Sequence, residues 1–162
     1  CHASGRFMVS VGDDCDLVIC RLVMLDDKSS HEHEKNDKGE DGEDGEEEED
    51  REMAEQGKKF LWKECSRLSK VHRRTVYSVD WAKTGHEMIA TASGDDTIRI
   101  FRLKDGSSLD ERNPQFEMVC EQLNAHETDL NCVAWNPVDP TLLTTVSDDG
   151  TLKIWKLVMD EE

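Results

Sequence analysis

Positive charge is scarce in this sequence. Lys and Arg number 20 against 37 Asp and Glu, which gives a formal net charge of −17 at pH 7. Binding to a nucleic-acid backbone requires clustered Lys and Arg, and the one such cluster runs from Lys70 to Arg74. We therefore expect no direct nucleic-acid binding. The sequence also lacks an apolar run of about 20 residues, the length that a membrane span needs, so we expect no membrane insertion.

Paired cysteines and converging metal ligands are lacking as well. The six cysteines are Cys1, Cys15, Cys20, Cys65, Cys120 and Cys132. They include no C-x-x-C motif, and most fall in stretches typical of strands, where a free thiol acts as a small apolar side chain. His31 and His33 form a flexible pair that would chelate only weakly. We expect reduced structural thiols, no metal and no cofactor; the alternative is a cysteine-based metal or redox protein.

One stretch occurs twice in the sequence, at residues 72–101 and 126–155. The first copy is HRRTVYSVDWAKTGHEMIATASGDDTIRIF and the second is HETDLNCVAWNPVDPTLLTTVSDDGTLKIW. The copies have the same length and align without a gap, from His72 with His126 to Phe101 with Trp155. An internal repeat of this kind is typical of folds that are built from similar supersecondary units.

Each copy predicts three strands and a tight turn. The strands are expected at Val76 to Trp81, Met88 to Ser93 and Thr97 to Phe101, and at Leu130 to Trp135, Leu142 to Ser147 and Thr151 to Trp155. The turns at 94–96 and 148–150 consist of Gly and Asp, which tolerate positive φ. Spaced apolar residues at Phe60 to Leu68 and Phe116 to Leu123 predict a fourth strand before each copy. Four strands per unit is the pattern of a propeller blade.

At these positions the chain resembles the WD-repeat family. The shared features are a histidine, a hydrophobic strand after it, S-x-D-x-T before the third strand, and an aromatic residue where the family has Trp-Asp. The copies depart from the family pattern because Val71 and Ala125 replace the usual Gly before the histidine, and Phe101 replaces Trp in the first copy. The resemblance implies an all-β fold, a WD-repeat β-propeller.

The resemblance also suggests a role for the polar residues that recur in the copies. They are His72, Ser93, Asp95, His126, Ser147, Asp149 and Trp155. A His, Asp and Ser set suggests a hydrolytic triad, but a catalytic constellation has no reason to recur once per repeat. In WD repeats such groups form a hydrogen-bond network that ties the turn to the strands. We therefore predict a structural network and no catalytic, cofactor-binding or metal-binding residue.

The segments around the repeats extend the pattern. Residues 1–25 match the second and third strands of a blade, because Asp14 and Ile19 align with Asp95 and Ile100 at one constant offset. With full blades at 60–103 and 116–157, this makes about two and a half four-stranded blades, against roughly 4–8 blades in a closed ring. The fold class that we expect is thus an incomplete fragment of a propeller. Residues 104–115 are predicted to be a polar linker and residues 158–162 a tail.

Residues 26–59 are predicted to be a disordered acidic insertion. The segment contains 16 acidic and 6 basic residues, and such a composition cannot bury enough apolar surface to order itself. We interpret it as a solvated filler; the alternative is an acidic segment that binds a partner.

Outside the insertion, the chain resembles the last two blades of the WD-repeat proteins of cytosolic iron–sulfur protein assembly. The resemblance is most specific over 75–101 and 129–155, and LWKECSRLSKVH at 61–72 fits as well. It implies a non-catalytic scaffold, located in the cytoplasm and also in the nucleus, that itself holds no cluster. The implied partners are proteins of the cytosolic iron–sulfur targeting complex and client apo-proteins. The alternative is another WD-repeat scaffold, of the coat or nuclear-pore type.

Overall fold

All regular secondary structure in the described part of the chain is β-strand. The computed structural model describes residues 1–25, 59–84 and 87–158, which form ten strands. In chain order these are β1 (Phe7–Val11), β2 (Leu17–Leu25), β3 (Lys59–Leu68), β4 (Val76–Trp81), β5 (Met88–Ser93), β6 (Ile98–Leu103), β7 (Phe116–Gln122), β8 (Leu130–Trp135), β9 (Leu142–Ser147) and β10 (Leu152–Lys156). The all-β prediction is confirmed. No helix able to span a membrane occurs among the residues that the structure describes.

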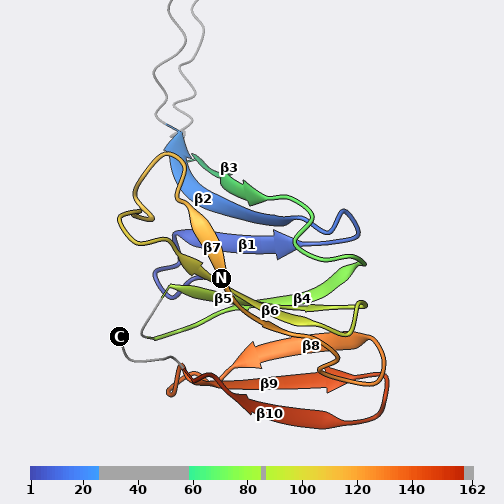
Figure 1. Cartoon of the computed structure of the whole chain (residues 1–162). Coiled ribbons are helices and arrows are strands. Elements are labelled where there is room, and N and C mark those ends of the chain that lie inside the picture. The colour runs from blue at the N-terminus through green and yellow to red at the C-terminus, as the bar shows by residue number, and fades with distance from the viewer. Residues whose placement is uncertain (26–58, 85–86, 159–162) are drawn as a thin grey trace, which may run out of the picture. The chain divides into compact units, whose positions relative to one another are not determined.

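The strands form three antiparallel sheets (Figure 1). The first sheet has the order β1-β2-β3, the second β4-β5-β6-β7 and the third β8-β9-β10. The outer strand of the first sheet, β3, and that of the second, β7, each precede the histidine of the following sequence copy. The predicted blades at 60–103 and 116–157 begin with β3 and β7, but in the structure each of these strands is the last strand of the preceding sheet.

The inner strands have the boundaries that the apolar pattern predicts, while the third strand of each copy is shifted. β4, β5, β8 and β9 begin and end at the expected residues. β6 begins at Ile98, one residue later than predicted, because the hydroxyl of Thr97 donates to the carbonyl of Asp95 inside the turn. β10 likewise begins at Leu152, after Thr151 has bonded Asp149.

The turns that join β1 to β2, β5 to β6 and β9 to β10 each contain one residue with a positive φ at the same position. Cys15, Asp96 and Gly150 occupy it, with φ of 61°, 62° and 77°. These three residues occupy the same position in the alignment of the sequence repeats. The expectation that Asp and Gly supply positive φ in these turns is confirmed by Asp96 and Gly150.

Apolar side chains fill the two spaces between neighbouring sheets. Between the first and second sheets, one cluster contains Phe7, Leu17, Ile19, Val71, Val76, Trp81, Ile89 and Phe101. Between the second and third sheets, the other contains Ala82, Met88, Ala90, Ala92, Ile98, Ile100, Ala125, Leu130, Val133, Trp135 and Leu143. Trp81 and Trp135 occupy the same repeat position and are both buried. Each sheet thus packs on the next through equivalent faces.

The chain divides into two compact units, one of Cys1–Leu22 with Trp62–Glu162 and one of Val23–Leu61. Of the second unit, the structure describes only the end of β2 and the start of β3, where Met24, Leu25 and Phe60 are exposed. The predicted insertion at 26–59 lies outside the described residues except for Lys59, and with it His31 and His33. The predicted tail lies outside them after residue 158.

Candidate functional site

The third sheet contains a chain of four hydrogen-bonded side chains. The indole Nε1–H of Trp155 donates to Thr145 Oγ1 at 2.8 Å, and His126 Nε2 lies 2.8 Å from the same hydroxyl. On its other side, His126 Nδ1 lies 2.9 Å from Asp149 Oδ2. His126 and Thr145 are buried. The chain of bonds therefore ties β10, β9 and the turn between them to the segment before β8.

One placement of protons satisfies all four groups. His126 Nδ1–H donates to the Asp149 carboxylate, the Nε2 lone pair accepts the Thr145 hydroxyl proton, and the Thr145 oxygen accepts the indole N–H. Each of the four groups therefore has a hydrogen-bond partner, and none of their polar atoms is buried unsatisfied.

The carboxylate of Asp149 holds the turn. Oδ1 accepts from the hydroxyl of Thr151 at 2.6 Å and from its backbone N–H at 2.8 Å, while Oδ2 accepts from the N–H of Glu127 at 3.1 Å. The Thr151 hydroxyl is the main cause of a lowered pKa for Asp149, and the two N–H groups lower it further against the effect of burial. Asp149 is therefore ionised at neutral pH.

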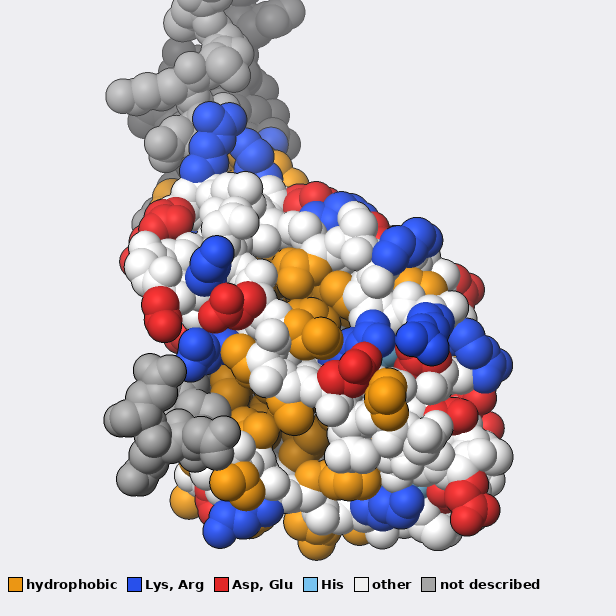
Figure 2. Space-filling view, viewed as in Figure 1, with side chains coloured by type: hydrophobic (Ala, Val, Ile, Leu, Met, Phe, Trp, Pro, Cys, Tyr) orange, Lys and Arg blue, Asp and Glu red, His pale blue; other side chains and the backbone are white. Residues whose placement is uncertain are grey.

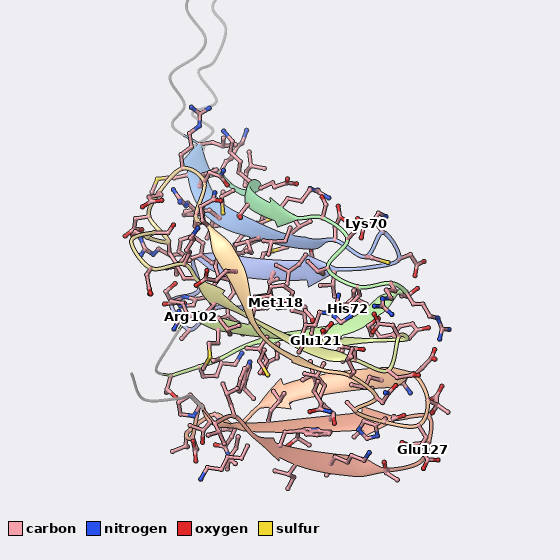
Figure 3. The ribbon with its side chains drawn as sticks, viewed as in Figure 1. Lys70, His72, Arg102, Met118, Glu121 and Glu127 are labelled. Atoms are coloured by element: carbon pink, nitrogen blue, oxygen red, sulfur yellow. The ribbon has the colours of Figure 1, made fainter. Side chains whose placement is uncertain are left out.

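The second sheet repeats this arrangement with one group missing. His72 Nδ1 lies 3.1 Å from Asp95 Oδ1, and His72 Nε2 lies 2.7 Å from Thr91 Oγ1 (His72 is labelled in Figure 3). Phe101 stands where the third sheet has Trp155, so Thr91 receives no indole hydrogen bond. Burial lowers the pKa of His72 and keeps the ring neutral. Burial raises the pKa of Asp95, but the N–H of Arg73 and the His72 ring outweigh it and lower the pKa overall.

The two predicted serines are the last residues of β5 and β9, and they form hydrogen bonds with the backbone of the adjoining turns rather than with the histidines. Ser93 Oγ accepts from the N–H of Asp95 at 3.2 Å and donates to the carbonyl of Arg74 at 3.2 Å. Ser147 Oγ accepts from the N–H of Asp149 at 3.2 Å and donates to the carbonyl of Thr128 at 3.1 Å. A nucleophilic serine needs a base within hydrogen-bond reach. No bond between a serine and a histidine joins these turns within the described part of the chain.

Sequence reasoning missed the threonines of the network. Thr91 and Thr145 bridge the histidines to the rest of each sheet, and Thr151 completes the turn in the third. Their signal is the repeat itself, since Thr91 and Thr145 align in the two copies, in strands otherwise made of apolar and small residues. A buried hydroxyl in such a strand needs a partner, and the histidine is the partner that recurs with it.

All six cysteines are free thiols. Burial raises the pKa of Cys20, Cys65 and Cys120 and so favours their protonated form. Among residues 1–25, 59–84 and 87–158, no group of three or more His, Cys, Asp or Glu side chains is placed to hold a metal ion.

Polar contacts also join the inner strands of neighbouring sheets. Ser78 Oγ on β4 accepts from the N–H of Val133 on β8 at 3.2 Å, and Asp80 Oδ2 accepts from the N–H of Trp135 at 2.9 Å. At the end of the same strands, Asp129 accepts from the guanidinium of Arg74 at 2.9 Å. Each of these bonds crosses from one sheet to the next, so together they hold the second and third sheets against each other.

Comparisons with known proteins identify repeats and relatives. The family described as "WD domain, G-beta repeat" matches residues 63–102 and 118–156. A relative from Nematostella vectensis named "Probable cytosolic iron-sulfur protein assembly protein CIAO1 homolog" is 46% identical over 106 residues, which are 65% of this chain and 32% of the relative. The Anopheles gambiae protein named "Probable cytosolic iron-sulfur protein assembly protein Ciao1" is 50% identical over 99 residues, 60% of this chain and 28% of that protein. The chain thus spans about a third of the length of the curated relatives it matches.

Solved structures share the fold at low sequence identity. The crystal structure of Chaetomium thermophilum Sqt1 matches with a TM-score of 0.56 and 17% identity, over 94% of this chain and 28% of that one. The Chaetomium thermophilum polycomb repressive complex 2 matches with a TM-score of 0.55 and 17% identity, over 89% of this chain and 22% of that one. At this identity the likeness shows the fold alone. The sheets described above are a part of a WD-repeat β-propeller.

Proposed function

Because the chain carries two WD repeats and resembles proteins named for cytosolic iron–sulfur protein assembly, we propose that it is a non-catalytic scaffold in that process. The observation that carries the proposal is the 46% identity to the Nematostella vectensis relative over 106 residues. In this role the iron–sulfur cluster is cargo that passes to apo-proteins. The chain supplies a surface on which protein partners meet.

The rigidity of the sheets supports a scaffolding role. Ser78 and Asp80 on β4 accept hydrogen bonds from the backbone N–H groups of Val133 and Trp135 on β8, and the apolar cluster around Trp135 lies between the same sheets. A rigid support of this kind presents loops and edges at constant spacing, and loops can vary without disturbing the core. Partners can therefore be held at fixed positions relative to one another.

The hydrogen-bond network supports a structural role for the recurring polar residues. His72, His126 and their Asp partners are tied to threonines and backbone N–H groups inside each sheet. Ser93 and Ser147 are occupied by turn bonds. We accordingly assign these residues and Trp155 to fold stability, and none to catalysis or to cofactor or metal binding.

The partners that we propose are proteins of the cytosolic iron–sulfur targeting complex and client apo-proteins. The formal net charge of −17 disfavours contact with nucleic acid, and we propose no membrane partner. The location that we propose for this role is the cytoplasm, with the nucleus as a second location.

Affinity purification tests the function. The tagged chain, expressed in cells, is recovered and its bound proteins are identified by mass spectrometry. We expect enrichment of iron–sulfur assembly factors over the Asp149→Ala variant, whose third sheet is weakened. Enrichment of coat or nuclear-pore proteins instead would contradict the proposal and favour the alternative scaffold.

A further inference from the structure

Two serines of the described chain are followed by carboxylates both two and three residues later. Ser93 precedes Asp95 and Asp96, and Ser108 precedes Asp110 and Glu111. A protein kinase whose substrate groove is basic selects serines by carboxylates at such positions, because charge complementarity between the groove and the substrate sets its specificity. Both serines fit this pattern in the sequence, so the structure has to separate them.

The structure buries Ser93 and exposes Ser108. Ser93 is the last residue of β5 and is fully buried, and its hydroxyl donates to the carbonyl of Arg74 at 3.2 Å. Ser108 is exposed and lies in the linker between β6 and β7 (Figure 1). Its Oγ accepts from the N–H of Asp110 at 3.3 Å, and its own proton has no acceptor among the described residues. A kinase can therefore reach the hydroxyl of Ser108 but not that of Ser93.

The serine next to it, Ser107, is already bonded on both sides. Its hydroxyl donates to Glu111 Oε2 at 3.1 Å and accepts from the N–H of Gln115 at 3.0 Å. Glu111 also accepts from the N–H of Ser108 at 3.0 Å, so its carboxylate holds the turn, whereas the side chain of Asp110 is 74% exposed. Figure 2 shows Asp and Glu side chains at the surface on the left of the view, where Figure 1 places the linker. The linker thus presents one hydroxyl with an available proton beside an exposed carboxylate.

The contacts that hold the linker do not use the side chain of Ser108. Arg21 Nη2 donates to the carbonyl of Leu109 at 2.6 Å and also to the carbonyl of Glu111, and Leu109 packs against the apolar cluster between the first and second sheets. The turn that begins at Ser108 is closed by one backbone bond, from the N–H of Glu111 to the Ser108 carbonyl at 3.1 Å. A turn with so few bonds on the surface opens at little cost in free energy, as binding in a kinase groove requires.

Arg6 and Ser108 line the same hollow, which has a volume of about 360 Å³. Arg6 Nη2 lies 3.5 Å from Asp110 Oδ1, and both side chains are more than half exposed. The Glu87 carboxylate, in the same hollow, is already bonded to His2 Nε2 at 3.0 Å. A phosphate on a serine carries up to about two negative charges and three strong acceptor oxygens. The Arg6 guanidinium therefore gains more from a phosphate on Ser108 than from its long contact with Asp110.

We propose that Ser108 is a phosphorylation site for a serine kinase with a basic substrate groove, and that Arg6 binds the phosphate. The Ser108 oxygen forms a bond to the γ-phosphorus of ATP while the bond from that phosphorus to the bridging oxygen of ADP breaks, and the hydroxyl proton passes to the catalytic Asp of the kinase. The phosphate draws Arg6 away from Asp110 and ties the linker to the segment before β1. The inference holds independently of the role in iron–sulfur assembly.

Phosphorylation of the whole chain in vitro tests the site. The probe is casein kinase 2 with ATP, and fragmentation mass spectrometry assigns the phosphate and separates Ser108 from Ser29 and Ser30, which also precede Glu32. We expect phosphate on Ser108 and none on Ser93. A short peptide of residues 88–99, which cannot bury its serine, should be phosphorylated on Ser93 by the same kinase. Absence of phosphate from Ser108 in the chain, or labelling of Ser93 at the same rate, overturns the proposal.

Two Asp variants test recognition by the kinase. Asp110→Asn keeps the backbone bond to Ser108 but removes the carboxylate two residues after the serine. The kcat/KM for phosphorylation of Ser108 should fall by about 10-fold, the effect of losing one charge-assisted contact with the kinase. The matched control is Asp105→Asn, because Asp105 is 91% exposed in the same linker but precedes the serine; it should leave kcat/KM unchanged. An equal fall in both variants would mean that only net charge matters and would overturn the assignment.

The urea midpoint tests the role of Arg6. The phosphorylated chain should have a higher midpoint than the unphosphorylated chain, because the phosphate bonds Arg6 and ties the linker to the first sheet. Arg6→Gln should abolish this rise and should change the unphosphorylated chain little, since an exposed ion pair contributes little to stability. Lys104→Gln, which removes a charge at the start of the linker, is the control and should keep the rise. A midpoint that falls when the native chain is phosphorylated would show that repulsion by Asp110 and Glu111 dominates, and would overturn the role of Arg6.

Discussion

The carboxylate of Asp80 on β4 accepts a hydrogen bond from the backbone N–H of Trp135 on β8, with 2.9 Å between Oδ2 and N. The bond joins the inner strands of two sheets, and Trp135 is buried. Lys83 pairs with Oδ1 of the same carboxylate at 3.0 Å. Asp80 therefore connects a surface charge to the backbone of the neighbouring sheet.

We expect Asp80→Ala to lower the free energy of unfolding by about 1–3 kcal/mol, because the N–H of Trp135 loses its acceptor in a buried place. Asp80→Asn keeps an acceptor oxygen and should cost less. Urea denaturation followed by tryptophan fluorescence measures both. Lys83→Ala leaves the bond between Asp80 and Trp135 in place, removing the ion pair and the bond from Lys83 Nζ to the carbonyl of Cys1, and serves as the control. A loss as large as that of Asp80→Ala would assign the effect to Lys83.

Trp155→Phe makes the network of the third sheet resemble that of the second. It removes the indole donor to Thr145, so we expect a loss of about 1 kcal/mol in the free energy of unfolding. In the same denaturation assay, Asp149→Ala should cost more than Asp95→Ala, because Phe101 already leaves the second network without that donor. Equal losses for the two Asp variants would show that the indole contributes nothing.

Gly94 is closely surrounded by Asp129, which precedes β8 of the neighbouring sheet, and by Tyr77 on β4 of its own sheet. A Cβ at this position would lie 3.0 Å from Asp129 Oδ2 and 3.1 Å from Tyr77 Cε2. Gly94→Ala should therefore destabilise the chain by about 1–3 kcal/mol through overpacking, measured as a fall in the urea midpoint. Gly12→Ala is the control, since its nearest contact is 3.8 Å. A midpoint for Gly94→Ala no lower than that of this control would show that Asp129 and Tyr77 move aside freely.

Stability should fall in two steps as the pH is lowered. Burial lowers the pKa of His72 from its ordinary value of 6.5, so the unfolded chain binds more protons and stability declines as pH falls below about 6.5. The lowered pKa values of Asp95 and Asp149 give stability that is present above their ordinary value of 3.8 and is lost as pH falls below it.

The urea midpoint between pH 3 and pH 8 measures both steps. His72→Asn should be less stable at pH 7 and should lack the upper step. An upper step that persists in this variant would assign it to another group.

The sequence predicted most of the strands because their apolar pattern reflects burial in the sheets. Val76–Trp81 and Met88–Ser93 are strands at the predicted residues. Thr97 was misplaced in a strand because the bond from its hydroxyl to the turn cannot be read from alternation. The repeat also shows which polar residues recur together. It does not show that Thr145 bridges two of them, because this follows only from the hydrogen bonds of Trp155 and His126 to the same hydroxyl.

Contacts between sheets were beyond sequence reasoning. Asp80 has no equivalent in the second copy, where Ala134 occupies its position, so the repeat gives no signal for its bond to Trp135. Arg21 has an equivalent, Arg102, but its own partners are the backbone carbonyls of Leu109 and Glu111. Every residue has a backbone carbonyl, so the residue type does not show which carbonyl accepts a hydrogen bond.

The measurement that tests the central claim most directly is the incorporation of radioactive iron into a cytosolic iron–sulfur protein. Cells depleted of the protein that contains this chain are compared with untreated cells, and a mitochondrial iron–sulfur protein serves as the internal control. A scaffold of cytosolic assembly predicts reduced iron in the cytosolic client, unchanged iron in the mitochondrial protein, and recovery when expression is restored. Unchanged iron in the cytosolic client after depletion would contradict the account.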